Sequence, residues 1–265
     1  MHSIPKKIHY VWLGDSPKND FILKCIDSWK KYFPDFEIKE WNNDSFSFIK
    51  NDYALEAFNN RKWAFASDYI RLYALYHEGG IYLDTDVEVT NTFENFMHLD
   101  FFTSHEIHKK SCFPIASAVI GAQKGNKIIG DLLHLYSGLK FKNNNEFDLM
   151  PITIRITNYF EKAFNFMPPY NPNGQVQLMN NAIIFPSYYF CMPEINKNNY
   201  AIHHFMGSWL PDYARRDKLT FFKKIILTRF SKRRDSDDYG LKKNEKLLFK
   251  FKISSRKEFA LILKH

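Results

Sequence analysis

A helix pattern that runs directly into a strand pattern lies in residues 63–89 of the chain. Eleven of the fourteen residues of Trp63–Tyr76 are apolar and fall all round a helix, so this helix should be buried on nearly every side. Gly79 and Gly80 then end it, and Ile81–Val89 has the composition of a strand. This helix–turn–strand unit is typical of an α/β sheet.

The same alternation of strand and helix signals extends along most of the chain. We expect further strands at Lys7–Leu13, Phe36–Trp41, Phe101–Ser104, Ala116–Ala122, Ala182–Phe185 and Tyr200–Phe205, and further helices at Asp20 to about Phe33, near Asn126–Tyr136 and near Pro151–Phe164. The pattern predicts an α/β fold with helices on both faces of the sheet. Such sheets bind ligands at the carboxyl ends of their strands.

Composition excludes several other classes of protein. With 45% hydrophobic residues in 265, the chain can bury a sizeable core and is not generally disordered. Its three cysteines form no CxxC pair, which argues against a disulfide framework or a structural zinc site. We see no apolar run of the roughly 20 residues that a membrane span needs and no signal-peptide stretch, and we expect a cytoplasmic location.

The formal net charge of +8 is concentrated in the last quarter of the chain. Residues 201–265 contain 17 Lys and Arg but only 7 Asp and Glu. We therefore expect a catalytic domain over residues 1–210 and a basic extension over 211–265. An anionic partner would contact the extension alone.

An amphipathic helix is expected within this extension, over residues 217–234. Its apolar face would contain Leu219, Phe222, Ile225, Ile226 and Phe230, with basic residues around it. Basic amphipathic helices lie in the interface of anionic membranes. Packing of the apolar face on the catalytic domain is the alternative. Nucleic acid is disfavoured, because no groove-reading motif is present.

The buried helix predicted at Trp63–Tyr76 contains a single polar stripe. Ser67, Asp68 and Arg71 fall within one arc of about 100°. A surface ion pair between Asp68 and Arg71 at i, i+3 is the simplest explanation. Burial makes that explanation costly, because charges removed from water need further partners. We therefore favour contact with a ligand.

Two aspartates that are two residues apart follow this helix in the sequence. On a strand, Asp84 and Asp86 would project from the same face, where they repel unless a cation lies between them. Oxygen ligands favour a hard ion such as Mg²⁺ or Mn²⁺. Such an ion lets a nucleotide diphosphate approach two carboxylates. Arg71 can then donate to a phosphate or sugar oxygen, and Asp68 can accept from sugar hydroxyls.

Three segments together resemble a known family of enzymes. IPKKIHYVWLG, ASDYIRLYALYHEGGIYLDTDVE and YAIHHFMGSW are similar to glycosyltransferase family 32, and more distantly to clostridial glucosylating toxins. The resemblance spans about residues 3–210. It implies a GT-A fold, a nucleotide-sugar donor with Mn²⁺ or Mg²⁺, and transfer with retention of configuration. Bacterial members suggest a UDP-sugar and a glycan or glycolipid acceptor in surface polysaccharide synthesis, whereas yeast relatives use GDP-mannose.

The resemblance also implies roles for individual residues. Asp84 and Asp86 match the metal-binding Asp-x-Asp, and Asp68 and Arg71 match positions that hold the donor sugar and diphosphate. Trp12 matches an aromatic residue that stacks on the base, although without the resemblance a core aromatic would be the better interpretation. The residues that would complete the donor pocket are Val11, Leu13 and Tyr82.

The third segment would complete the metal site. Only one of the adjacent His203 and His204 can point to the metal from a strand, and we favour His203. Ser208 and Trp209 match the closing Ser-Trp of the family, which contacts the diphosphate or shields the site.

The acceptor side departs from the family pattern. Residues 150–153, Met-Pro-Ile-Thr, lack the glycine that usually precedes the proline. No nucleophile can be identified, and Glu106 and Asp148 are the candidate assistants. Two other functions remain open, namely a nucleotide-sugar hydrolase with the same metal site and a non-catalytic module that binds glycan or membrane.

Overall fold

The computed structural model describes nine stretches of the chain. They are residues 3–47, 49–108, 111–144, 146–179, 181–207, 218–221, 225–230, 245–254 and 257–264. The chain divides into two compact units, Met1–Phe205 and Met206–His265, each described below on its own.

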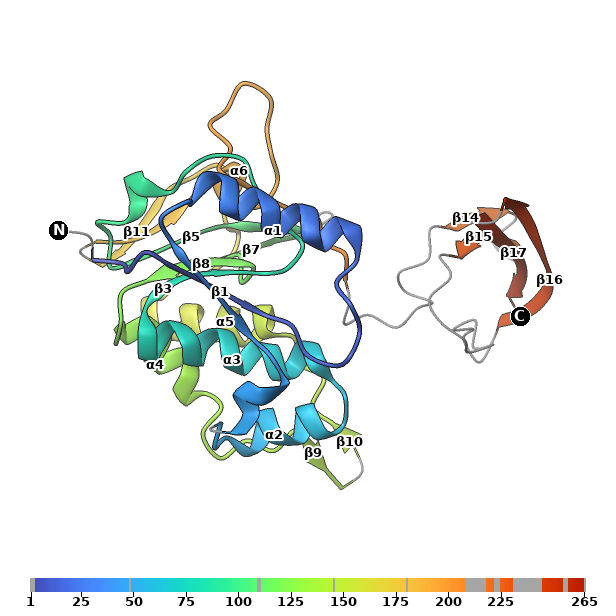
Figure 1. The fold of residues 1–265 in the computed structure, drawn as a ribbon, viewed down its shortest axis with the longest axis horizontal. Helices are drawn as coiled ribbons and strands as arrows, with labels where there is room; N and C mark the ends of the chain where they lie inside the picture. The colour runs from blue at the N-terminus through green and yellow to red at the C-terminus, as the bar shows by residue number, and fades with distance from the viewer. Residues whose placement is uncertain are drawn as a thin grey trace. The chain divides into compact units, whose positions relative to one another are not determined.

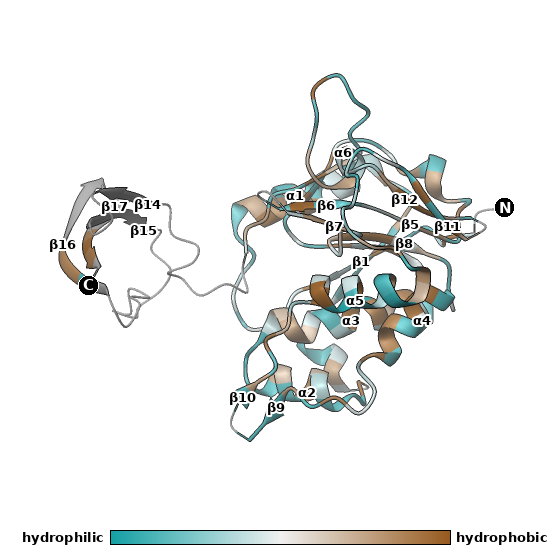
Figure 2. Ribbon diagram, turned by 180° about the vertical axis from the view of Figure 1, so that it is seen from behind, coloured by the Kyte–Doolittle hydropathy of each residue, from teal (hydrophilic) through white to brown (hydrophobic). Residues whose placement is uncertain are grey.

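A seven-stranded mixed sheet forms the centre of the first unit. In spatial order its strands are β11 (Val176–Met179), β12 (Ala182–Phe185), β5 (Phe101–Ser104), β8 (Val119–Ala122), β3 (Gly80–Leu83), β1 (Lys7–Val11) and β2 (Glu37–Trp41). Only β8 and β11 run against the other five strands. Hydrophobic residues dominate β8 and β12 (Figure 2). The prediction of an α/β fold is confirmed.

Helices cover both faces of this sheet (Figure 1). The helices are α1 (Asp20–Tyr32), α2 (Asp52–Asn59), α3 (Trp63–Glu78), α4 (Lys127–His134), α5 (Ile152–Phe164) and α6 (Ser187–Phe190), with short 3₁₀ turns at Asn43–Ser47 and Glu94–Phe96. The two faces have separate cores, one beneath α1 and one beneath α3, α4 and α5. No described helix could cross a membrane.

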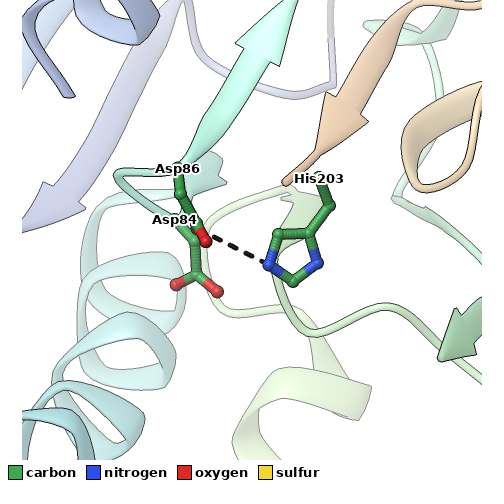
Figure 3. A group of neighbouring side chains, drawn as sticks. All are labelled: Asp84, Asp86 and His203. Carbon is green, nitrogen blue, oxygen red and sulfur yellow. Dashed lines mark ion pairs between the residues drawn. The ribbon is translucent and has the colours of Figure 1, made fainter. Parts of the chain in front are cut away.

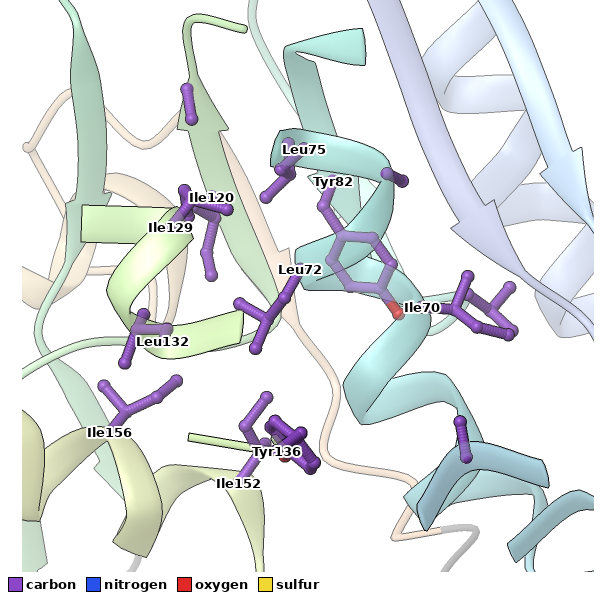
Figure 4. Close-up of a cluster of buried hydrophobic side chains, with 14 of the residues drawn as sticks. Ile70, Leu72, Leu75, Tyr82, Ile120, Ile129, Leu132, Tyr136, Ile152 and Ile156 are labelled. Carbon is purple, nitrogen blue, oxygen red and sulfur yellow. The ribbon is translucent and has the colours of Figure 1, made fainter. Parts of the chain in front are cut away.

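Helix α3 is the buried element that the sequence predicts. Its apolar side chains pack among those of α4, α5 and β8, where Leu72 and Leu75 lie close to Ile120 and Ile129 (Figure 4). It ends at Gly79, whose φ of 68° and approach to the backbone of Lys124 leave no space for a Cβ atom.

The strand predicted over Ile81–Val89 is broken, which corrects the expectation that Asp84 and Asp86 lie on one strand face. β3 ends at Leu83, and β4 (Val87–Val89) pairs with β13 (Ala201–His203) in a different sheet. Between them the chain turns, and the Val87 N–H donates to the Asp84 carbonyl at 3.0 Å. Side chains alternate between the two faces of a sheet only along a continuous strand. Because the chain passes from one sheet to another here, that alternation does not extend across Asp84 and Asp86.

Two short hairpins complete the first unit. One pairs β6 (Glu106–His108) with β7 (Ser111–Phe113), and the other pairs β9 (Lys142–Asn143) with β10 (Glu146–Phe147).

In the second unit the described residues 218–221, 225–230, 245–254 and 257–264 form a β-sheet, so the prediction of a helix is wrong for them. Its strands are β14 (Lys218–Phe221), β15 (Ile225–Phe230), β16 (Glu245–Ser254) and β17 (Lys257–Lys264), in the order β14-β15-β17-β16. Every residue of β15 has a partner on β17. The spacing of apolar residues reports only on neighbouring positions, and on that basis it predicted a helix. The pairing of β15 instead depends on β17, about thirty residues further along the chain. Isoleucine and threonine in β15 also favour a strand.

Candidate functional site

Three side chains with metal-ligand chemistry meet where β3 and β13 end and β4 begins. Asp84, Asp86 and His203 can each offer one ligand atom, and these atoms lie within 4.8 Å of one another (Figure 3). The ladder between β4 and β13 places His203 opposite Val87, beside the turn that contains the aspartates. The His204 N–H also donates to the Asp86 carbonyl at 3.1 Å, which ties β13 to this turn.

The two adjacent histidines face different partners. His203 Nε2 lies 3.5 Å from Asp86 Oδ1. His204 Nε2 lies 3.0 Å from Glu88 Oε2, and its ring packs edge-on against Phe21. The structure thus places His203, and not His204, with the aspartates.

Negative charge dominates at this point of the structure. Burial alone would lower the pKa of His203, but the hydrogen bond to Asp86 and the charges of both aspartates raise it to about 10. The pair of carboxylates therefore favours a cation between them. Two carboxylates and one imidazole form a donor set that would suit a divalent metal such as Mn²⁺ or Mg²⁺.

Tyr82 and Arg71, which are both buried, contact the carboxylate of Asp84. The Tyr82 hydroxyl donates to Asp84 Oδ1 at 2.8 Å, and Arg71 Nη1 lies 3.2 Å from the same oxygen. The Arg71 guanidinium also lies over the Tyr82 ring, 4.7 Å from its centroid. Tyr82 was predicted to contact the donor, and the structure places it beneath Asp84 with only 2% of its surface exposed.

Asp68 and Arg71 form an ion pair with each other, as the simplest explanation of their spacing has it, but the pair is buried and not on the surface. Arg71 Nη2 donates to Asp68 Oδ1 at 2.8 Å, and its Nη1 donates to the Ser117 carbonyl at 2.9 Å. Both side chains are buried. Burial raises the pKa of Asp68 to about 7 despite the opposing charge of Arg71. Because Arg71 also pairs with Asp84, the polar stripe of α3 is joined directly to the metal-ligand cluster.

Trp12 follows the carboxyl end of β1, an edge where such sheets bind ligands. Its ring is partly exposed, whereas the neighbouring Val11 and Leu13 are buried in the core. The Trp12 indole donates to the Ser16 carbonyl at 2.8 Å, and the Lys18 ammonium lies 5.5 Å from its ring centroid. A partly exposed, oriented aromatic ring is suited to stacking.

Glu106 is a buried acid close to this cluster. Burial raises its pKa to about 7, and His203, Asp84 and Arg71 are the charges that act on it. Asp148, the other candidate assistant, is paired with Arg155 of α5. Sequence reasoning missed Arg155, although it lies only two residues after the unusual segment 150–153. Ser208 and Trp209 lie outside the described residues.

Part of the N-terminal half of the chain is similar to a known protein family. Residues 20–105 match the family described as "Glycosyltransferase sugar-binding region containing DXD motif". The chain is 24% identical over 234 residues to an uncharacterized glycosyltransferase of Acanthamoeba polyphaga mimivirus, across 84% of this chain and 90% of that protein. It is also 29% identical over 134 residues to inositol phosphoceramide mannosyltransferase 3 of Schizosaccharomyces pombe, across 48% of this chain but only 35% of that protein.

Solved structures of glycosyltransferase domains are similar to parts of the chain. The PaToxG glycosyltransferase is 21% identical with a TM-score of 0.46, across 61% of this chain and 70% of that one. The ligand-free glycosyltransferase domain of the YGT toxin is 10% identical with a TM-score of 0.33, across 64% and 70%.

Proposed function

We propose that this chain, a glycosyltransferase of the DXD type, transfers a hexose or N-acetylhexosamine from a nucleotide sugar to a glycan or lipid-linked oligosaccharide. We favour a UDP-sugar as donor, a role in surface polysaccharide synthesis, and dependence on Mn²⁺ or Mg²⁺. The observation that carries the proposal is the convergence of Asp84, Asp86 and His203 beside the buried pair of Asp68 and Arg71. This arrangement combines a cation site with a hydrogen-bonding site for a sugar.

In this proposal different residues of the site bind different parts of the donor. Trp12 stacks on the base, and Asp68 accepts hydrogen bonds from sugar hydroxyls. Arg71 donates to a diphosphate or sugar oxygen in the enzyme–donor complex. Asp84, Asp86 and His203 would hold the divalent ion, which as a Lewis acid stabilises negative charge on the departing diphosphate.

Retention of configuration follows in this proposal from a reaction on one face of the sugar. The departing diphosphate oxygen takes the proton of the acceptor hydroxyl, while Arg71 supports its negative charge. Glu106 is the candidate assistant. It is a buried carboxyl, and the charges of His203, Asp84 and Arg71 act on it.

A panel of nucleotide sugars with Mn²⁺ tests the proposed donor. We expect one donor to raise the midpoint of thermal unfolding, because a ligand that binds only the folded state stabilises it. The shift should disappear when EDTA is added. GDP-mannose in the panel tests the alternative carrier. No shift with any nucleotide sugar, with or without metal, would contradict the proposal.

Product analysis distinguishes transfer from the two competing functions. A hydrolase would release free sugar at the same rate whether or not an acceptor is present, whereas a transferase forms a new glycoside. A non-catalytic binding module would keep its function when Asp84 or Asp86 is replaced by alanine.

The basic charge of residues 201–265 supports a peripheral location at the inner face of the cell membrane, with this segment in contact with anionic lipid. Each Lys or Arg near such a surface contributes about 1 kcal/mol. We expect the full chain to float with vesicles of phosphatidylglycerol and phosphatidylcholine at low salt, and much less at 0.5 M NaCl. A variant ending at Pro211 should not float. Equal flotation of both chains would contradict this location.

A further inference from the structure

The guanidinium of Arg71 pairs with two carboxylates, those of Asp68 and Asp84. Arg71 Nη2 lies 2.8 Å from Asp68 Oδ1, and Arg71 Nη1 lies 3.2 Å from Asp84 Oδ1. One guanidinium between two carboxylates leaves a net negative charge, and the Asp68 carboxylate is buried whereas that of Asp84 is partly exposed. Removing a carboxylate from water costs several kcal/mol unless other charges and hydrogen bonds compensate it. A second positive charge near Asp68 would therefore help to keep its carboxylate ionised.

Arg155 of α5 provides that positive charge. Only 11% of its side chain is exposed, and it forms an ion pair with Asp148. Its guanidinium carbon lies 5.4 Å from the ring centroid of Tyr53 and 5.5 Å from that of Tyr136. Burial raises the pKa of Asp68, and the charges of Arg71 and Arg155 both act against that rise.

The tyrosines connect Arg155 to the polar stripe of α3. The Tyr136 ring packs edge-on against Tyr53 at 5.0 Å and against Tyr69, the residue after Asp68, at 5.8 Å. Tyr136 is buried, in the same cluster as Ile152 and Ile156 of α5 (Figure 4). A planar guanidinium can contact two rings and a carboxylate together, which a lysine ammonium does less well.

We propose that Arg155 is a positioning residue for the donor sugar, acting through Asp68. Asp148 and the two tyrosine rings fix its guanidinium, and its charge keeps the Asp68 carboxylate oriented to accept hydrogen bonds from sugar hydroxyls. The inference rests on the proposed function, in which Asp68 holds the sugar. Arg155 should therefore affect binding of the sugar but not of the nucleotide, because the proposed base contact comes from Trp12 after β1 and the proposed metal contacts come from the turn before β4 and from His203 of β13.

The test compares an intact donor with its nucleoside diphosphate in the full-length chain. The donor is the nucleotide sugar that the unaltered protein turns over, and the diphosphate is the one released from it. We expect Arg155→Met to reduce kcat/KM for the donor by about tenfold to a hundredfold, as misplacement of a binding group does. The Kd of the diphosphate with Mn²⁺ should stay within about twofold of the unaltered value. Arg155→Lys should recover part of the loss.

Lys39→Met is the matched control. Lys39 combines an ion pair with Glu78 and a contact with the Trp41 ring at 4.5 Å, and none of these residues belongs to the proposed site. This variant should keep both values. If Arg155→Met weakens the donor and the diphosphate equally, or leaves both unchanged, the inference is wrong. If the unaltered protein turns over no nucleotide sugar, the proposed function fails first and the inference fails with it.

Discussion

Replacement of Asp86 by alanine should reduce sugar transfer by about a thousandfold at saturating Mn²⁺. Asp86 lies in the turn between β3 and β4, beside His203, and its loss removes one of the two carboxylates that favour a cation at this site. A divalent ion stabilises developing charge by several kcal/mol, and each 1.4 kcal/mol corresponds to about a tenfold change in rate. Initial rates of glycoside formation and calorimetric titration with Mn²⁺ measure the two effects.

Neighbouring acidic and imidazole groups provide the controls for this variant. Glu88→Ala removes a carboxylate two residues away that pairs with His204 and is half exposed. It should change the rate by less than about twofold, because exposed pairs contribute little. His203→Ala should weaken Mn²⁺ binding, and His204→Ala should not. Full activity of Asp86→Ala, or equal losses in Glu88→Ala, would contradict a metal site at these residues.

Replacement of Arg71 by methionine should destabilise the protein by about 3–5 kcal/mol and also abolish transfer. Arg71 pairs with Asp68 and Asp84 and donates to the Ser117 carbonyl, and its side chain is 6% exposed. Removing one partner of a buried pair leaves an uncompensated buried charge, which costs about that much. The free energy of unfolding from urea denaturation measures the first effect.

Two further variants separate stability from activity at this position. Arg71→Lys keeps the charge but loses the planar fork that spans two carboxylates, so we expect a smaller loss of stability and a large loss of transfer. Lys127→Met breaks an exposed ion pair with Asp131 and should change stability by less than about 0.5 kcal/mol. An unchanged free energy of unfolding in Arg71→Met would show that the buried charges have other partners.

Local sequence signals predicted most of the first unit. Helix α1 begins after Asn19, whose side chain accepts from the Ile22 N–H as a capping residue should. Helix α3 ends at Gly79, where a positive φ is required. These signals succeed because caps, glycine turns and apolar periodicity act within a few residues of the position they determine.

Long-range pairing explains what the sequence could not show. The composition of Ile81–Val89 predicted one continuous strand with Asp84 and Asp86 on the same face, but β4 pairs with β13 outside the main sheet. The apolar spacing near residue 225 predicted a helix, but β15 pairs with β17. Arg155 was missed because its proximity to Asp68 depends on how α5 packs beside α3, which no local pattern records.

The chemical character of the site could be read in the sequence alone, in Asp68, Arg71, Asp84 and Asp86 and in their position after a buried helix. Only the tertiary structure decided how they are connected. It brings His203 from more than a hundred residues away to Asp86, and it makes Arg71 the common partner of Asp68 and Asp84. The physical reason is that residue type determines which charges a buried site must compensate, whereas the path of the backbone determines which groups can compensate them.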